Sequence, residues 1–98
     1  MADLRVEWDA HKARANLRRH RVSFEEAETA FLDEEALVIP DPDHSQVEDR
    51  FILLGLSAQV RVLFVCHCVR EGGSLIRIIS ARRANRREQG QYWERLRR

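Results

Sequence analysis

The sequence predicts an α+β domain in which two N-terminal helices pack on an antiparallel meander sheet, with a further helix at the C-terminus. Three observations predict it. One short strand is followed by two amphipathic helical segments, and these are followed by four apolar segments with two short turns among them. One amphipathic segment lies at the end of the sequence. Short turns between consecutive strands favour antiparallel pairing, because a parallel connection needs a crossover of about a dozen residues or more. Helices that are segregated from the strands along the chain are typical of the α+β class.

The length and the composition fit one domain that spans residues 1–98. A chain of 98 residues with 44% hydrophobic residues can fold alone around a thin core. No apolar run approaches the ~18 residues that a membrane-spanning helix needs, and no signal-peptide pattern is present at the start. Cys66 and Cys68 are two residues apart in an apolar run, a spacing that does not favour a disulfide between them. We therefore expect a cytoplasmic protein without disulfides.

The N-terminal third predicts one strand and two capped helices. Residues Leu4–Trp8 alternate in polarity as a short strand does, and Asp9 is suited to cap the helix that follows. Ser23 and Glu26 have the spacing of a capping box, which places a second helix at about Phe24–Leu32.

The remainder predicts four strands and a last helix. The strands are expected at residues 36–40, 50–56, 61–69 and 74–81, with a loop rich in proline and aspartate between the first two and a turn at Gly72-Gly73 before the last. Asn85 and Glu88 can cap a helix from about Arg86 to Leu96. Because the strands are apolar at both parities, both sheet faces are expected to be covered, one by the N-terminal helices and the other partly by the last helix or a partner chain.

The charges are distributed very unevenly although the net charge is only +1. Residues 25–49 contain ten acids and no Lys or Arg, whereas residues 77–98 contain eight arginines against two acids, which is +8 − 2 = +6. Of the seventeen Lys and Arg residues only Lys12 is a lysine, and arginine is the better bidentate ligand of phosphate. The asymmetry indicates a nucleic-acid surface on the basic side. The acidic segment can repel nucleic acid or meet a basic partner, and both runs can also be ordinary solvated faces.

Four arginines lie within six residues where the last strand passes into the last helix: Arg82, Arg83, Arg86 and Arg87. A helix N-terminus attracts phosphate through its free N–H groups, and guanidinium groups add to that attraction. Arginine in a first helical turn opposes the helix dipole, and such local conflicts gather at functional sites. The pattern indicates a phosphate-binding site that faces RNA, and a solubilising tail is the alternative.

Proton-transfer groups are needed if such a site is to cut RNA. His67 interrupts an apolar strand, where it is either a structural residue or an acid or base. Tyr92 in the last helix is a proton donor, a base-stacking residue or a packing residue beside Trp93. Arg50 begins a strand next to Glu48 and Asp49, and one of these three is expected to reach the same cleft. No metal-ligand spacing, phosphate-cradling glycine loop or nucleophile elbow is present.

Several segments together resemble the BrnT family, the toxins of bacterial type II toxin–antitoxin modules. They are VEWDAHKARANLRRHRVSFEEA, the loop DPDH, the strand start DRFILLGL, and IRIISARRANRRE followed by Tyr92. The resemblance covers roughly Val6 to Tyr92. Two departures are visible: Arg21 stands where a glycine is common, and cysteines flank His67.

The resemblance implies a RelE-like fold and a ribonuclease that blocks translation. It also implies a BrnA-like antitoxin that binds the operator DNA, in a heterotetramer of two toxins and two antitoxins, so that the toxin contacts DNA only through its partner. Neither a metal ion nor another cofactor is implied. The residues that match family motifs are Lys12, Asn16, His20, Arg50, His67, Arg70, Arg77, Ser80, Arg82, Arg83, Arg86 and Tyr92.

We therefore hypothesise a metal-independent endoribonuclease in which the RNA 2′-hydroxyl attacks the adjacent phosphorus. The predicted catalytic residues are Arg50, His67, Arg82 and Tyr92, and the predicted RNA-binding residues are Lys12, Arg70, Arg77, Arg83, Arg86 and Arg87. Two other functions stay open: a non-catalytic binding module that acts in a repressor complex, and a gyrase poison like the ParE toxins, which share the fold.

Overall fold

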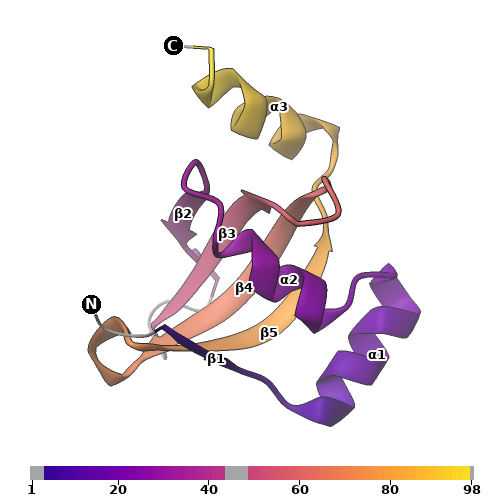
Figure 1. Ribbon diagram of the computed structural model, residues 1–98, viewed down its shortest axis with the longest axis vertical. Helices are drawn as coiled ribbons and strands as arrows, with labels where there is room; N and C mark the ends of the chain where they lie inside the picture. Colours follow the sequence, from indigo (N-terminus) through magenta and orange to yellow (C-terminus); the bar gives the residue numbers. More distant parts are fainter. Residues whose placement is uncertain (1–3, 44–48, 98) are drawn as a thin grey trace.

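The computed structural model describes residues 4–43 and 49–97, which form three α-helices and five strands (Figure 1). The elements are β1 (Arg5–Glu7), α1 (Ala10–His20), α2 (Phe24–Ala30), β2 (Leu37–Pro40), β3 (Arg50–Leu56), β4 (Val62–Arg70), a short 3-10 turn (Glu71–Gly73), β5 (Leu75–Arg83) and α3 (Arg86–Arg95). The predicted α+β class and the predicted element order are both confirmed. Part of the predicted proline-rich loop, with His44 and Glu48, lies outside the described residues.

The sheet is mixed, with strand order β1-β5-β4-β3-β2. Consecutive strands from β2 to β5 pair antiparallel, as the short turns predict, but β1 pairs parallel with β5. The expectation of a purely antiparallel meander is therefore wrong at this edge. The reason is that residues 8–74, about two-thirds of the chain, separate β1 from β5, so no short turn restricts their relative direction.

The helix caps follow the local sequence. The Asp9 side chain accepts a hydrogen bond from the Lys12 N–H at 2.9 Å, and the Ser23 hydroxyl accepts one from the Glu26 N–H at 2.9 Å. Asn85 and Glu88 form the complete reciprocal capping box at the start of α3. At α2 the Glu26 side chain is bound elsewhere, so Ser23 makes only its own half of the predicted box.

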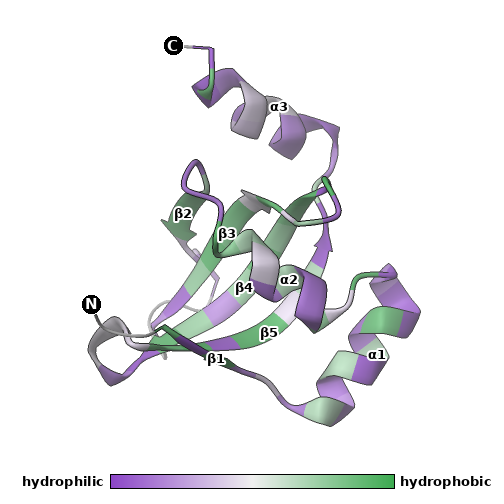
Figure 2. Ribbon diagram, viewed as in Figure 1, coloured by the Kyte–Doolittle hydropathy of each residue, from purple (hydrophilic) through white to green (hydrophobic). Residues whose placement is uncertain are grey.

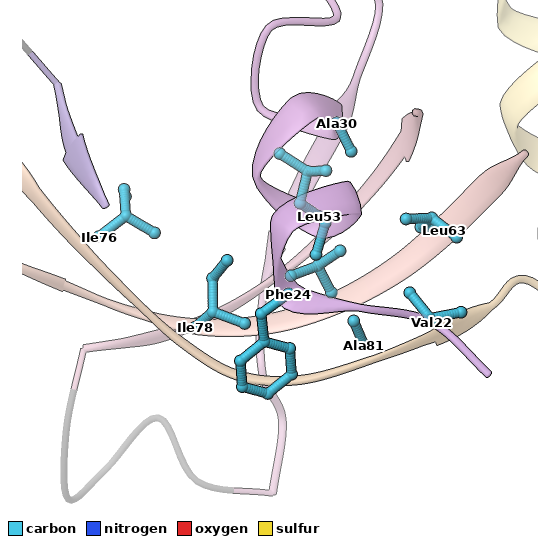
Figure 3. Packing of buried hydrophobic residues seen from close by; sticks show 10 residues of the cluster. Val22, Phe24, Ala30, Leu53, Leu63, Ile76, Ile78 and Ala81 are labelled. Carbon is cyan, nitrogen blue, oxygen red and sulfur yellow. The ribbon is translucent and has the colours of Figure 1, made fainter. Parts of the chain in front are cut away.

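The main core lies between the sheet and the pair α1 and α2. Val22 and Phe24 enter it from the start of α2 and pack against Ile78 and Ala81 of β5 (Figure 3). Gly55 of β3 is required there, because an added Cβ would lie 2.8 Å from the Ala30 carbonyl oxygen. The helix can approach the sheet this closely only over a residue without a side chain.

A smaller cluster lies on the opposite side of the sheet, under α3. Tyr92 packs there with Leu54, Val62 and Ala84. Figure 2 shows the contrast between the apolar strands and the predominantly hydrophilic α3, which stands at one end of the sheet and covers only part of this side. The expectation that the last helix covers part of the second face is confirmed. Within the described ranges, no helix is both long and apolar enough to span a bilayer.

One buried side chain, the amide of Asn16, joins α1 to β5. Its Nδ2 donates to the Ala81 carbonyl at 2.8 Å and to the Val22 carbonyl at 3.0 Å, and its Oδ1 accepts from the Ala81 N–H at 3.1 Å. β1 pairs with β5 only as far as Arg77. The amide therefore satisfies the peptide groups of Ala81 on an edge that no strand covers, as a neighbouring strand would.

A β-bulge interrupts β5 two residues before this clamp. Cys66 is opposite Ser80 and His67 is opposite Ile78, so Ile79 is an extra residue without a partner in β4. Side chains alternate between the two faces of a regular strand, and an extra residue reverses that alternation beyond it. The bulge therefore decides which face each later side chain of β5 occupies.

A buried ion pair joins α2 to the turn between β3 and β4. Arg61 binds both carboxylate oxygens of Glu26, with Nε 2.9 Å from Oε2, and Ser57 donates to the same oxygen at 2.7 Å. The Glu26 side chain is 2% exposed. The hydrogen bonds from Arg61 lower the pKa of Glu26, although burial opposes them.

Arg21 ends α1 in the left-handed conformation with φ 58° and ψ 30°. This conformation costs roughly 1 kcal/mol for a residue with a Cβ, and glycine adopts it freely. We predict that Arg21→Gly raises the free energy of unfolding by about 0.5–1 kcal/mol, measured by urea denaturation. Arg19→Gly, inside the same helix, is the control and is expected to lose about 1 kcal/mol. A less stable Arg21→Gly protein contradicts the account.

Glu26→Gln removes the buried carboxylate and leaves Arg61, which is 24% exposed, and we expect it to lower the free energy of unfolding by about 1.5–3 kcal/mol at neutral pH. A carboxyl whose pKa is lowered by folding stabilises the protein above its unfolded pKa, here 4.5, and this stabilisation is lost as the pH falls through the lower folded value. The difference between wild type and variant should therefore shrink below pH 4.5. Denaturant titrations at a series of pH values measure it, and a difference that stays constant down to pH 3 contradicts the prediction.

Candidate functional site

The face of the sheet opposite α1 and α2, called here the outer face, carries most of the strand arginines. Core residues such as Leu53 and Val65 point toward the helices, so their alternate neighbours point outward. On this basis the outer-face arginines are Arg5, Arg50, Arg70, Arg77 and Arg82. Arg77 and Arg82 are five residues apart and would lie on opposite faces of a regular strand. The bulge at Ile79 brings them to the same face.

Arg82 is the most tightly held of these arginines. Its Nη1 and Nη2 donate to the two carboxylate oxygens of Glu88 at 2.8 and 2.9 Å, and Nη1 also donates to the Arg83 carbonyl at 3.2 Å. The guanidinium carbon lies 3.8 Å from the centroid of the Phe64 ring. The Arg82 side chain is nevertheless 35% exposed. An aromatic ring and a carboxylate thus fix the orientation of an arginine that solvent still reaches.

Glu88 is held as firmly as the arginine it binds. Its Oε1 accepts from the Asn85 N–H at 2.8 Å, while its own N–H donates to the Asn85 side chain at 2.8 Å. The hydrogen bonds from Arg82 lower the pKa of Glu88, so the carboxylate is ionised at neutral pH. The capping box of α3 and the orientation of Arg82 therefore depend on the same side chain.

The four arginines predicted to share one phosphate site do not lie on one side of the sheet. Arg83 is opposite Leu63, a core residue, so it points away from Arg82 and toward the side where its charge lowers the pKa of Glu26. Arg86 and Arg87 are exposed in the first turn of α3. The structure thus separates Arg82 from Arg83.

Arg50 lies at the other end of the outer face. It is opposite Cys68, four residues along β4 from the residue opposite Arg82. That spacing is about 13 Å along the strands and about 10 Å across them. Between the two arginines lies Cys66, whose thiol contacts the Asp41 carboxylate at 3.6 Å. Burial, followed by the charge of Asp41, raises the pKa of Cys66 to about 11, so the thiol is protonated at neutral pH.

The remaining outer-face arginines lie near the hairpin that joins β4 to β5. Arg77 binds Glu7 of β1 at 2.8 Å, and Arg5 binds Glu71. A cavity of about 640 Å³ lies beside them, and its lining includes Arg70 and three acids, Glu7, Asp49 and Glu71. Arginine and carboxylate alternate in this region, so it is less basic than the end that carries Arg82.

His67 is buried on the helical side of the sheet and is 2% exposed. Its ring lies edge-on to Phe31 at 4.8 Å between centroids and near Phe51 at 6.2 Å, and Nδ1 is 3.2 Å from the Val65 carbonyl oxygen. Burial lowers the pKa of His67. It also points toward α2, away from the outer-face arginines. In this arrangement the imidazole cannot reach an RNA on the outer face, and the geometry favours the structural role.

Tyr92 is also 2% exposed, and its hydroxyl is engaged. It donates to Asp33 at 2.5 Å, and the same carboxylate oxygen accepts the Leu56 N–H at 2.8 Å. Burial and the neighbouring carboxylate raise the pKa of Tyr92. Arg95 adds a bond from α3 to the Glu35 carbonyl at 3.1 Å. The position of Tyr92 fits an anchor that fastens α3 to the sheet.

The predicted RNA-binding residue Lys12 is exposed on α1, on the other side of the sheet from the outer face. The structure therefore divides the predicted set between two surfaces. Sequence reasoning did not assign site roles to the residues that hold Arg82 in place, namely Phe64, Glu88 and Asn16. Two signals marked some of them in advance: the Asn85–Glu88 spacing, and the match of Asn16 to a family motif. Among residues 4–43 and 49–97, no group of three His, Cys, Asp or Glu side chains is arranged to hold a metal ion.

Comparison with known proteins places this chain in one class, the ribonuclease toxins of type II toxin–antitoxin systems. A family model described as "Ribonuclease toxin, BrnT, of type II toxin-antitoxin system" matches residues 8–88. The chain therefore belongs to the BrnT family. The resemblance found in the sequence is confirmed.

A solved structure shows the same fold. The crystal structure of the Brucella abortus ribonuclease toxin BrnT matches with a TM-score of 0.64 and 22% sequence identity, over 85% of this chain and 99% of that chain. The curated proteins contain no sequence that matches this chain.

Tyr92→Phe separates the two roles considered for this tyrosine. Loss of the hydrogen bond to a charged carboxylate should lower the free energy of unfolding by about 1.5–3 kcal/mol. We expect the ribonuclease rate to stay within about threefold of wild type, measured on a defined RNA at a temperature where both proteins are folded. A folded variant whose rate falls a hundredfold would instead make the Tyr92 hydroxyl a proton donor.

Proposed function

We propose that this chain is a metal-independent endoribonuclease whose outer face binds RNA. The observation that carries the proposal is the gathering of arginines on that face, two of which, Arg50 and Arg82, lie on either side of the same stretch of β4. Membership of a ribonuclease-toxin family supports RNA as the substrate. Arginine suits phosphate recognition, and the exposed Arg86 and Arg87 at the start of α3 add positive charge next to Arg82.

The reaction we propose is transfer of a phosphodiester to its own 2′-oxygen. The 2′-hydroxyl gives up its proton to a solvent water as its oxygen bonds to the adjacent phosphorus, and the bond from phosphorus to the 5′-oxygen breaks. The leaving 5′-oxygen takes a proton from water, so the products are a 2′,3′-cyclic phosphate and a 5′-hydroxyl. Negative charge grows on the phosphoryl oxygens in the transition state. Preorganised cationic donors at those oxygens are usually the largest single contribution of a protein to such a step.

Arg50 is the arginine to which we assign this charge stabilisation. Arg86 and Arg87, exposed at the start of α3, and Arg70 and Arg77 at the other end of the sheet are assigned to binding the rest of the RNA backbone. Arg82 can bind a phosphate with both terminal nitrogens only if it releases Glu88, because those nitrogens donate to the Glu88 carboxylate. A proton-transfer role for His67 requires the rings of Phe31 and Phe51 to part, so the proposal does not depend on it.

We further propose that the fold is RelE-like and that the chain acts in the cytoplasm, where RNA cleavage stops translation. A type II system implies an antitoxin partner. We propose a BrnA-like antitoxin in a heterotetramer of two toxins and two antitoxins, which contacts operator DNA through the antitoxin. Exposed acids at Glu25, Glu28, Glu34 and Glu35 match a basic partner segment, and salt would then weaken the complex.

Cleavage of a defined single-stranded RNA in excess chelator tests the proposal. We expect wild type to cut, Arg50→Gln to be slower by about a hundredfold, and Arg19→Gln on α1, a matched loss of one exposed charge, to stay within threefold. His67→Gln is expected to retain its rate when folded. A cut that requires added Mg²⁺ contradicts metal independence, and equal rates for wild type and Arg50→Gln remove Arg50 from the site.

The same experiment distinguishes the other functions. A protein that binds RNA or antitoxin but never shortens RNA would be a binding module within a repressor complex. Growth arrest with intact RNA and a DNA-damage response would indicate gyrase poisoning.

A further inference from the structure

We propose that the guanidinium plane of Arg82 is a stacking platform for one unpaired base of the RNA, rather than a clamp for phosphate. The inference rests on the proposed function insofar as RNA is the ligand, and it assigns a subsite for a nucleobase. Three features of the site carry it: the edge of the guanidinium is occupied, one of its planes is covered, and the group is held rigid.

The edge of Arg82 that would grip a phosphate is already bound. Both terminal nitrogens donate to Glu88, at 2.8 and 2.9 Å, and Nη1 also donates to a backbone carbonyl. The bidentate geometry of arginine with a phosphate uses these same two nitrogens. The Glu88 carboxylate therefore occupies the position of a phosphate and repels a second anion there.

One plane of the guanidinium is covered by an aromatic ring, and the side chain as a whole is partly exposed. Phe64 lies 3.8 Å beneath it, centroid to guanidinium carbon, and the Arg82 side chain is 35% exposed. With Phe64 below and Glu88 and the Arg83 carbonyl along the edge, the opposite plane is where a flat ligand can lie. Bases of single-stranded RNA stack on arginine planes as well as on aromatic rings.

The platform is rigid before any ligand arrives. Glu88, 15% exposed, is fixed by its reciprocal hydrogen bonds with Asn85 in the capping box, so it cannot follow the arginine if that side chain swings. An arginine that is already ordered loses little conformational entropy on binding. Glu88 also compensates the charge of Arg82, which makes the plane a better surface for a neutral base than for a phosphate.

A stacking platform selects unpaired RNA. A base inside a duplex already has neighbours on both faces, and reaching Arg82 would require it to leave the stack. A loop, a bulge or a single strand presents its bases without that cost. The substrate class is therefore single-stranded RNA, with one base held at the Arg82 end of the outer face and the backbone running toward Arg50.

The test uses a fluorescent, 2′-O-methylated single-stranded RNA, which has no free 2′-hydroxyl and so is bound without being cut. A series in which one base at a time is removed keeps every phosphate. We expect wild type to lose about tenfold in affinity at one abasic position. Arg82→Lys keeps the charge but lacks the plane, and it should bind the intact RNA about tenfold more weakly and not distinguish that abasic position. Arg83→Lys, on the other side of the sheet, is the matched control and should behave as wild type.

The salt dependence of RNA binding distinguishes the stacking proposal from phosphate binding by Arg82. If Arg82 binds phosphate, Arg82→Gln should reduce the slope of log affinity against log salt by about 0.7, Arg82→Lys should bind normally, and no abasic position should matter. That result would overturn the stacking proposal. Phe64→Leu is a second variant, expected to weaken binding as Arg82→Lys does, with thermal melting confirming that each variant is folded. If wild type cleaves RNA but binds the intact and the abasic RNAs equally well, only this inference is contradicted. If wild type neither cleaves nor binds RNA, the proposed function is contradicted as well.

Discussion

The candidate site depends on one constraint: which face of the sheet each side chain of β5 occupies beyond the bulge. Ile79 is an extra residue without a partner in β4, and it shifts every later side chain of the strand to the other face. The Asn16 amide holds the strand just beyond it, because it satisfies both peptide groups of Ala81 with well-formed hydrogen bonds. The same amide binds the Val22 carbonyl and so ties the turn between α1 and α2 to β5. Without this shift Arg82 would point into the helical side of the sheet, where the core lies.

The rest of the site follows from that placement. Once Arg82 is on the outer face it lies over Phe64 and within reach of Glu88, whose position is set by the start of α3. Tyr92, four residues after Glu88 in the same helix, then binds Asp33 and fastens α3 to the segment after α2 and to β3. Packing and hydrogen bonding thus fix the position of Arg82 on the outer face. The stability of α3 and the orientation of Arg82 are coupled, because both depend on Glu88. A substitution in this helix is therefore expected to affect both folding and RNA binding.

The sequence predicted the elements well and the side-chain directions poorly. Element bounds were accurate because their signals are local: Asp9, Ser23 and Asn85 cap helices, and glycines mark the β4–β5 turn. The parallel pairing of β1 was missed because it joins residues 70 positions apart in the sequence, such as Arg5 and Leu75. Simple alternation along β5 explains why Arg82 and Arg83 point to opposite faces of the sheet. That Arg77 and Arg82 point to the same face depends on a bulge, which no residue type in the sequence predicts. His67 and Tyr92 were candidates for catalysis by residue type and by resemblance to family motifs, and only burial, which depends on the tertiary fold, distinguishes a structural imidazole or phenol from a reactive one.

The most direct test of the central claim is an NMR titration of the arginine Nε–Hε signals with the uncleavable single-stranded RNA, which reports each guanidinium separately. The account predicts that the signals of Arg50 and Arg82, on the outer face, shift on binding, while those of Arg61 and Arg83, on the helical side, stay where they are. Shifts confined to Arg83 and to the α1 arginines, with Arg82 unmoved, would contradict it. That result would place the RNA on the other side of the sheet and leave the outer face without a ligand.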